Sequence, residues 1–186
     1  SLVILNAPPA SQSELILERI VEERNTLYIS VERETPDVQK NFDEELFRSN
    51  QLVIRHPGLD SPLSNARDAL QQVTNQANII IDTTNILEQS DEQARYIKFL
   101  NELTTQLKNT DSIAILHSIK GINNPRLRDT TLQMADIVLD LDVDLEGDRI
   151  DNRLSIPKFR GGSALQDNIK LDMQDEVRVD TSRDIA

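Results

Sequence analysis

Short apolar segments alternate with segments of helical spacing from residue 2 to about residue 141. A short apolar run fits a strand that is buried on both faces, and each run here is followed by a stretch that can form a helix. Strands that alternate with helices in this way predict a parallel sheet with helices on both faces. The six expected strands are residues 2–5, 26–31, 52–54, 78–82, 112–117 and 137–141.

The pattern changes after about residue 142, where apolar and polar residues begin to alternate. Residues 153–158, 169–173 and 177–179 show this alternation, and residues 146–148 fit a hairpin turn. A period of two is typical of antiparallel strands with one solvated face. We therefore expect one α/β domain over residues 1–186, with a mostly parallel sheet, helices on both faces and a β-rich antiparallel hairpin extension from about residue 143.

The composition argues against several classes of function. The net charge of −12 and the aromatic content of 3% disfavour a broad nucleic-acid surface or a stacking platform for single strands. The absence of cysteine removes disulfides, thiolate zinc sites and cysteine nucleophiles. No apolar run approaches the roughly 18 residues that a membrane-spanning helix needs, so we expect a cytoplasmic protein without membrane contact.

The segment after the first strand has the outline of a phosphate-binding loop without its chemistry. Ser11 and Glu14 fit a capping box at the start of a helix. In the pattern G-x-x-x-x-G-K-[ST], the glycines let backbone N–H groups reach phosphate and the lysine binds the outer phosphates. Here Ser13 stands at the lysine position and Glu14 at the hydroxyl position. The degenerate loop, our candidate nucleotide-binding segment, comprises Ala7, Pro8, Pro9, Ala10, Ser11, Gln12, Ser13 and Glu14.

The other polar candidates are few. The sequence indicates no base that would activate Ser11 or Ser13, so we do not expect a nucleophile there. The two histidines, His56 and His117, are too isolated for a metal site. His117 ends a strand and should lie at the carboxyl edge of the sheet, where such sheets bind their ligands.

The order of these features resembles the RecA-type ATPase core, and within it the KaiC-like branch common in archaea. The resemblance includes the strand–loop–helix opening and strands that end in Glu32, Asp82 and His117. Two segments are more specific. Residues 134–139 (MADIVL) are similar to the family's A-D-x-V-h-x-L strand, and residues 158–161 (KFRG) are similar to its K-x-R-G finger. The chain resembles a degenerate archaeal member of haloarchaeal type.

The resemblance implies roles for particular residues. Glu32 matches the glutamate that polarises the attacking water in active relatives, and Glu34 is the alternative in a second alignment. Asp82 matches the carboxylate that positions magnesium, and would be the ligand if the metal binds. Lys158 and Arg160 match a finger that reaches a neighbouring subunit's phosphate. Each residue also has a structural explanation, because strand-end charges are commonly solvated and an edge-strand lysine discourages aggregation.

We therefore expect a pseudo-ATPase that serves as a regulatory or protein-interaction module, in signal transduction or in a mixed oligomer. It would have a protein partner or form an oligomer, and would bind no nucleic acid and no cofactor. The first alternative is an active ATPase with an unusual loop, with ATP and magnesium bound and Lys120 reaching the phosphates. The second is a role in DNA recombination or transcription, by analogy with recombinase relatives.

Overall fold

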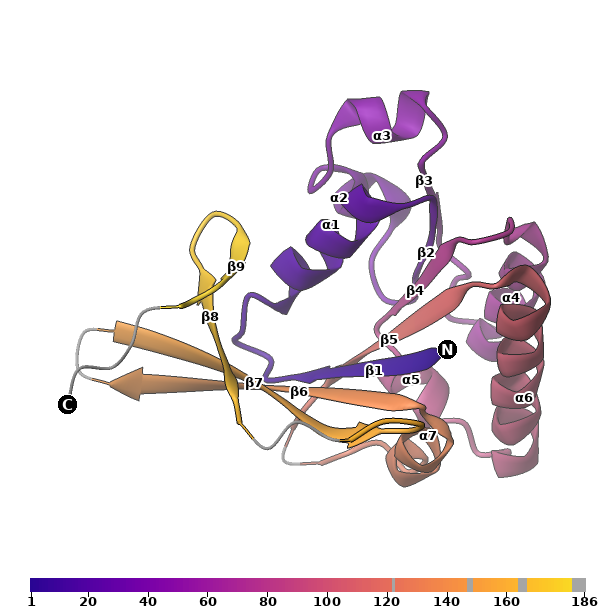
Figure 1. Ribbon diagram of the computed structural model, residues 1–186. Helices are drawn as coiled ribbons and strands as arrows, with labels where there is room; N and C mark the ends of the chain where they lie inside the picture. Colours follow the sequence, from indigo (N-terminus) through magenta and orange to yellow (C-terminus); the bar gives the residue numbers. More distant parts are fainter. Residues whose placement is uncertain (122, 147–148, 164–166, 182–186) are drawn as a thin grey trace.

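A single sheet runs through the molecule. The computed structural model describes residues 1–121, 123–146, 149–163 and 167–181. Within these residues the nine strands follow the order β3-β2-β4-β5-β1-β6-β7-β8-β9 (Figure 1). Pairing is parallel from β3 to β6 and antiparallel from β6 to β9. The strands are β1 (Leu2–Ala7), β2 (Thr26–Ser30), β3 (Leu52–Arg55), β4 (Asn78–Asp82), β5 (Ile113–Ile119), β6 (Ile137–Glu146), β7 (Arg149–Phe159), β8 (Ile169–Met173) and β9 (Val177–Val179).

Helices cover both faces of the parallel part, as the alternating pattern predicts (Figure 1). The first three lie on one face, where Leu17 and Val21 of α1 and Val38 of α2 join the core. The later ones lie on the other face, where Tyr96, Leu100 and other residues of α6 pack. The helices are α1 (Ser13–Glu23), α2 (Thr35–Gln39), α3 (Glu44–Arg48), α4 (Pro62–Ala69), α5 (Asn85–Glu88), α6 (Gln93–Thr110) and α7 (Arg128–Met134), with a short 3₁₀ turn over Leu70–Gln72.

The structure confirms the predicted fold class, including the antiparallel extension. The β6–β7 hairpin extends beyond the helical layers in Figure 1, and the β8–β9 hairpin packs back against α1. In register, Glu146 pairs with Arg149. Gly147 and Asp148 of the expected turn lie outside the described residues. None of the helices in the described ranges combines the length and apolarity needed to cross a membrane.

The predicted capping box at the first helix is wrong. The helix begins at Ser13, its N-cap is Gln12, and no side chain caps it. Ser11 instead closes a turn, because its hydroxyl and its backbone N–H both donate to the carbonyl of Pro8, at 2.7 and 3.1 Å. The two prolines set this turn, so the Ser11 hydroxyl is already used before the helix starts.

Candidate functional site

The residues at the carboxyl edge of the parallel strands form the candidate site. Asp82 is the last residue of β4 and pairs in register with His117 of β5, which in turn pairs with Leu5 of β1. The loop after β1 leads into α1, whose first residue is Ser13. Because parallel strands end at the same edge, three segments that are far apart in sequence bring Ser13, Asp82 and His117 together.

These three side chains form one hydrogen-bonded chain. His117 Nδ1 lies 2.6 Å from Asp82 Oδ1, and His117 Nε2 lies 3.0 Å from the Ser13 hydroxyl oxygen. The three residues are 1 to 3% exposed. Since a carboxylate can only accept, His117 Nδ1–H donates to Asp82, and Nε2 is then the acceptor for the Ser13 hydroxyl in the neutral imidazole. The expectation that Ser13 lacks a base is therefore wrong.

Two further donors saturate the other oxygen of Asp82. The Tyr28 hydroxyl and the Arg33 guanidinium each donate to Asp82 Oδ2 at 2.6 Å. Burial alone would raise the pKa of the Asp82 carboxyl, but hydrogen bonds from His117, Tyr28 and Arg33 lower it to about 2. Burial and the Asp82 charge raise the pKa of Tyr28 well above its usual range, so its hydroxyl stays a donor. We call Ser13, Tyr28, Arg33, Asp82 and His117 the Asp82 network.

The structure separates the two glutamates proposed as water-activating residues. Glu32 is exposed and accepts a hydrogen bond from the Thr83 hydroxyl at 2.8 Å, directly after Asp82. Glu34 lies near His56, with 3.5 Å between its carboxylate and His56 Nε2. Glu32 is thus the one that adjoins the Asp82 network, and its role in any reaction remains a prediction.

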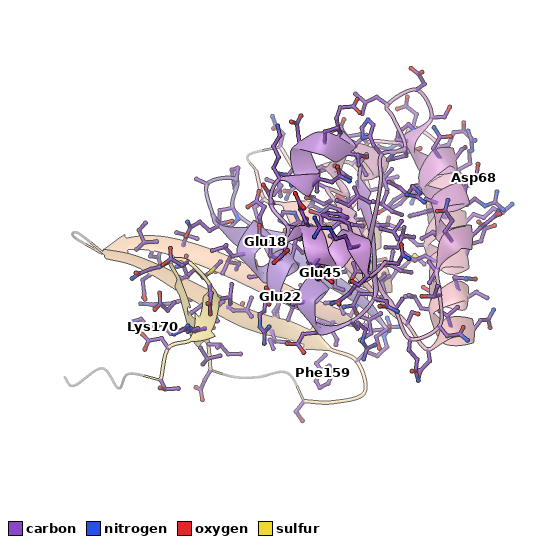
Figure 2. The ribbon with its side chains drawn as sticks, turned by 90° about the horizontal axis from the view of Figure 1, so that it is seen from above. Glu18, Glu22, Glu45, Asp68, Phe159 and Lys170 are labelled. Atoms are coloured by element: carbon purple, nitrogen blue, oxygen red, sulfur yellow. The ribbon has the colours of Figure 1, made fainter. Side chains whose placement is uncertain are left out.

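The degenerate loop lies at the same edge and lacks the lysine of the phosphate-loop pattern. Ser13, at the lysine position, is hydrogen-bonded to His117 and carries no charge. Glu14, Glu18 and Glu22 follow at intervals of four along α1, and Figure 2 labels the last two. Burial, then the charges of Glu14 and Glu22, raise the pKa of Glu18. Glu14, in the first turn, places a negative charge at the helix end that otherwise favours a phosphate anion.

Lys120, the lysine of the alternative with an unusual loop, is paired within the chain. Its ammonium pairs with Asp140 of β6 and lies 2.6 Å from Asp142. Its backbone N–H donates to the Ala7 carbonyl at 2.8 Å, which fixes it beside the end of β1. The ammonium charge is therefore paired with two carboxylates of β6.

The finger residues lie away from the Asp82 network. Lys158 donates to the carbonyls of Leu132 and Gln133 at the end of α7, at 2.7 and 2.9 Å. Arg160 donates to the Gln133 carbonyl at 3.2 Å and lies 3.5 Å from Asp136. The backbone of Leu2, at the start of β1, donates to Asp136, so the finger lies at the amino edge of the sheet. Within one chain the structure does not bring the finger to the candidate site.

A second buried polar cluster lies on the opposite face of the sheet, and sequence analysis missed it. Arg128 of α7 pairs with Glu88 of α5 at 2.8 Å and donates to Asn6 and Asn85 at 3.3 and 3.0 Å. Thr131 donates to Glu88 at 2.6 Å. No spacing signal marks these residues, because their helices are short and their partners are distant in sequence.

Tyr28 of the Asp82 network was also not predicted from the sequence. Its place in β2 could have indicated it, because alternation along the strand puts Tyr28 on the face that α1 covers.

Comparison with known proteins bears on the fold. A family model described as "Family of unknown function (DUF7125)" matches residues 1–186, and no curated protein matches the sequence. A KaiC-like protein from Pyrococcus horikoshii OT3 is similar with a TM-score of 0.74 at 15% identity, over 96% of this chain and 88% of its own. The flagellar accessory protein FlaH from Methanocaldococcus jannaschii is similar with a TM-score of 0.74 at 14% identity. The match covers 98% of this chain and 90% of FlaH. These similarities confirm the RecA-like, KaiC-like fold.

Proposed function

We propose that this chain, which belongs to the family of unknown function DUF7125, is a catalytically inactive pseudo-ATPase that acts as a regulatory or protein-interaction module. The observation that carries the proposal is that three donors from its own chain hold the Asp82 carboxylate. His117 occupies one carboxylate oxygen, while Tyr28 and Arg33 occupy the other. A carboxylate that binds magnesium, or a water of its shell, must turn an oxygen toward it.

Freeing the Asp82 carboxylate for a metal ion would have a large free-energy cost. Hydrogen bonds to a charged group contribute roughly 1.5–3 kcal/mol each, and three of them converge on this carboxylate. Removing them would also leave the buried Tyr28 hydroxyl and the His117 ring without their acceptor. The network therefore favours the closed arrangement over one in which the carboxylate faces a bound ion.

The other groups with which a phosphate loop would bind a nucleotide are also altered. Ser13 supplies no positive charge for the outer phosphates, and Glu14 adds a negative one at the start of α1. Lys120 is held by Asp140 and Asp142. These features support the loss of nucleotide binding as well as of hydrolysis.

The finger suggests how such a subunit would still be useful. Lys158 and Arg160 lie at the sheet edge opposite to the Asp82 network, where a neighbouring subunit could be approached without involving this chain's own site. We propose a protein partner or a mixed oligomer in which this chain contributes surface and not catalysis. A signalling role is the kind of function that such a module would serve.

ATP turnover by the purified chain tests the proposal. We expect no turnover at millimolar magnesium–ATP above that of Asp82→Asn, which controls for a contaminating ATPase. Glu32→Gln is a second control, because Glu32 is exposed and its change should leave the fold intact. Turnover by the unmodified chain that both variants abolish would refute the pseudo-ATPase and support the ATPase with an unusual loop.

A further inference from the structure

The Ser13–His117–Asp82 chain has the arrangement of a serine nucleophile with its base and an orienting carboxylate. The hydroxyl-to-imidazole distance is 3.0 Å and the imidazole-to-carboxylate distance is 2.6 Å, both within the reach expected of an activated serine. The order along the chain is serine, aspartate, histidine, and the serine opens a helix after a central strand. The same order and placement occur in hydrolases that evolved on another α/β fold.

Ser13 lies at the start of α1. It is the first residue of this eleven-residue helix, so its hydroxyl lies at the positive end of the helix dipole. Glu14 lies in the same first turn and adds a negative charge there. Nucleophile and base therefore meet where α1 begins, and an uncharged ester suits this position better than an anion does.

We propose that Ser13 is the nucleophile of an acyl-transfer site for small activated esters. Ser13 Oγ gives its proton to His117 Nε2 and forms a bond to the ester carbonyl carbon. The bond from that carbon to the leaving oxygen breaks, and the leaving alcohol takes the proton from His117. Water, activated by His117 in the same way, then releases the carboxylic acid and restores the Ser13 hydroxyl. Asp82 is a positioning residue that holds the imidazole and stabilises its protonated form.

Burial limits the substrate. Ser13 and His117 are each 1% exposed, so a substrate reaches them only when the loop before α1 moves aside. Pro9, Ala10 and Gln12 of that loop are exposed. Small acyl groups should therefore be accepted before large ones. The proposal does not rest on the loss of ATPase activity, because ester chemistry and nucleotide binding are measured independently.

Covalent labelling of the full chain by diisopropyl fluorophosphate tests the proposal. In the labelling step the Ser13 Oγ–P bond forms, the P–F bond breaks, and the hydroxyl proton leaves with fluoride by way of His117. Mass spectrometry should find a single adduct on Ser13, absent in Ser13→Ala and retained in Ser11→Ala, the matched control two residues away. His117→Gln should label about tenfold more slowly or worse.

The pH dependence separates a working base from a structural hydrogen bond. The labelling rate of the unmodified chain should fall on acidification, because a base that already carries a proton cannot accept the one from Ser13. This readout decides the matter even if His117→Gln fails to fold. The proposal is overturned if Ser13 gains no adduct under conditions that label a serine esterase. A labelling rate independent of pH, or unchanged in a folded His117→Gln, overturns it equally.

Discussion

Three donors surround the buried Asp82 carboxylate. Because they stabilise its charged form, the ionisation of Asp82 contributes to the free energy of folding. The folded-state pKa of about 2 lies below the ordinary value of 3.8. A depressed pKa contributes stability that is present above pH 4 and is lost as the pH falls toward 2. Each pKa unit corresponds to about 1.4 kcal/mol, so the contribution is about 2 kcal/mol.

The first prediction concerns acid and Asp82→Asn. At pH 6 the variant should unfold with a free energy lower than that of the unmodified chain by about 2 kcal/mol or more, because an amide cannot replace the charged acceptor. Between pH 4 and pH 2 the difference should shrink, since the unmodified chain then also loses the charge. Denaturant unfolding at several pH values measures both. A difference that stays constant over this range would mean that Asp82 is not held ionised by its partners.

Part of the site at the residue scale follows from the sequence. Asp82 and His117 lie side by side near one edge of the sheet, as parallel topology predicts. His117 does not end its strand as expected, because β5 continues to Ile119. What fills the site could not be predicted, because the contact of Ser13 with His117 depends on where α1 begins. The prolines and Ser11 move that start to Ser13, and a capping box two residues earlier is what the pattern suggested.

At the scale of elements, the Arg128–Glu88 pair ties α7 to α5 beneath the sheet. Both residues are almost fully buried, and burial raises the pKa of Glu88 against the opposing effects of Thr131 and Arg128. Their partners Asn6 and Asn85 extend the cluster to β1 and the start of α5. The pair is therefore a joint between elements, and removing one partner leaves an uncompensated buried charge.

The second prediction is that Arg128→Ala destabilises the fold by about 3–5 kcal/mol. Arg126→Ala is the matched control and should be nearly neutral, because Arg126 is exposed and its guanidinium makes a long 3.4 Å contact to the Asp91 carbonyl. Thermal and denaturant unfolding of the two variants measure the contrast. Equal stabilities would show that the buried pair does not hold α5 and α7 together.

The third prediction concerns the finger, which also serves the end of α7. Lys158→Ala removes two hydrogen bonds to the last carbonyls of that helix and should cost about 1 kcal/mol. Arg160→Ala should cost less, because Arg160 is more exposed and its contacts are longer. Unfolding curves compare the two. If Arg160→Ala lowers the free energy of unfolding more than Lys158→Ala does, Lys158 does not stabilise the end of α7. If Arg160→Ala lowers it less, Arg160 is the better residue to change when a protein partner is tested.

The elements also show which patterns are reliable. Every apolar run became a strand, because burial on both faces demands continuous apolar sequence. The segment from Thr35 to Arg48 forms two short helices, α2 and α3, and not one continuous helix. Asp43 starts the second by accepting from the Glu45 N–H at 2.9 Å, and Phe42 packs edge-on against Tyr28, with 5.7 Å between ring centres. That break depends on a tertiary contact, which local spacing does not reveal.

At the scale of the whole molecule, the fold is similar to that of a KaiC-like protein over 96% of the chain at 15% identity, with a TM-score of 0.74. The carboxyl edge of the parallel strands, where such sheets bind their ligands, holds the Asp82 network. Ser13 stands there at the position of the lysine in the phosphate-loop pattern. The fold depends on the distribution of apolar residues along the chain, and many different sequences can supply it. Ligand binding depends on a few particular side chains, and replacing them changes it.

Calorimetric titration of the purified chain with magnesium–ATP, at low and at high salt, measures whether nucleotide binding is lost. We expect no binding at millimolar nucleotide under either condition, because three donors of the chain hold the Asp82 carboxylate and the loop lacks its lysine. Tight binding that Asp82→Asn weakens would contradict it, since the carboxylate would then have to leave Tyr28, Arg33 and His117 to serve the metal.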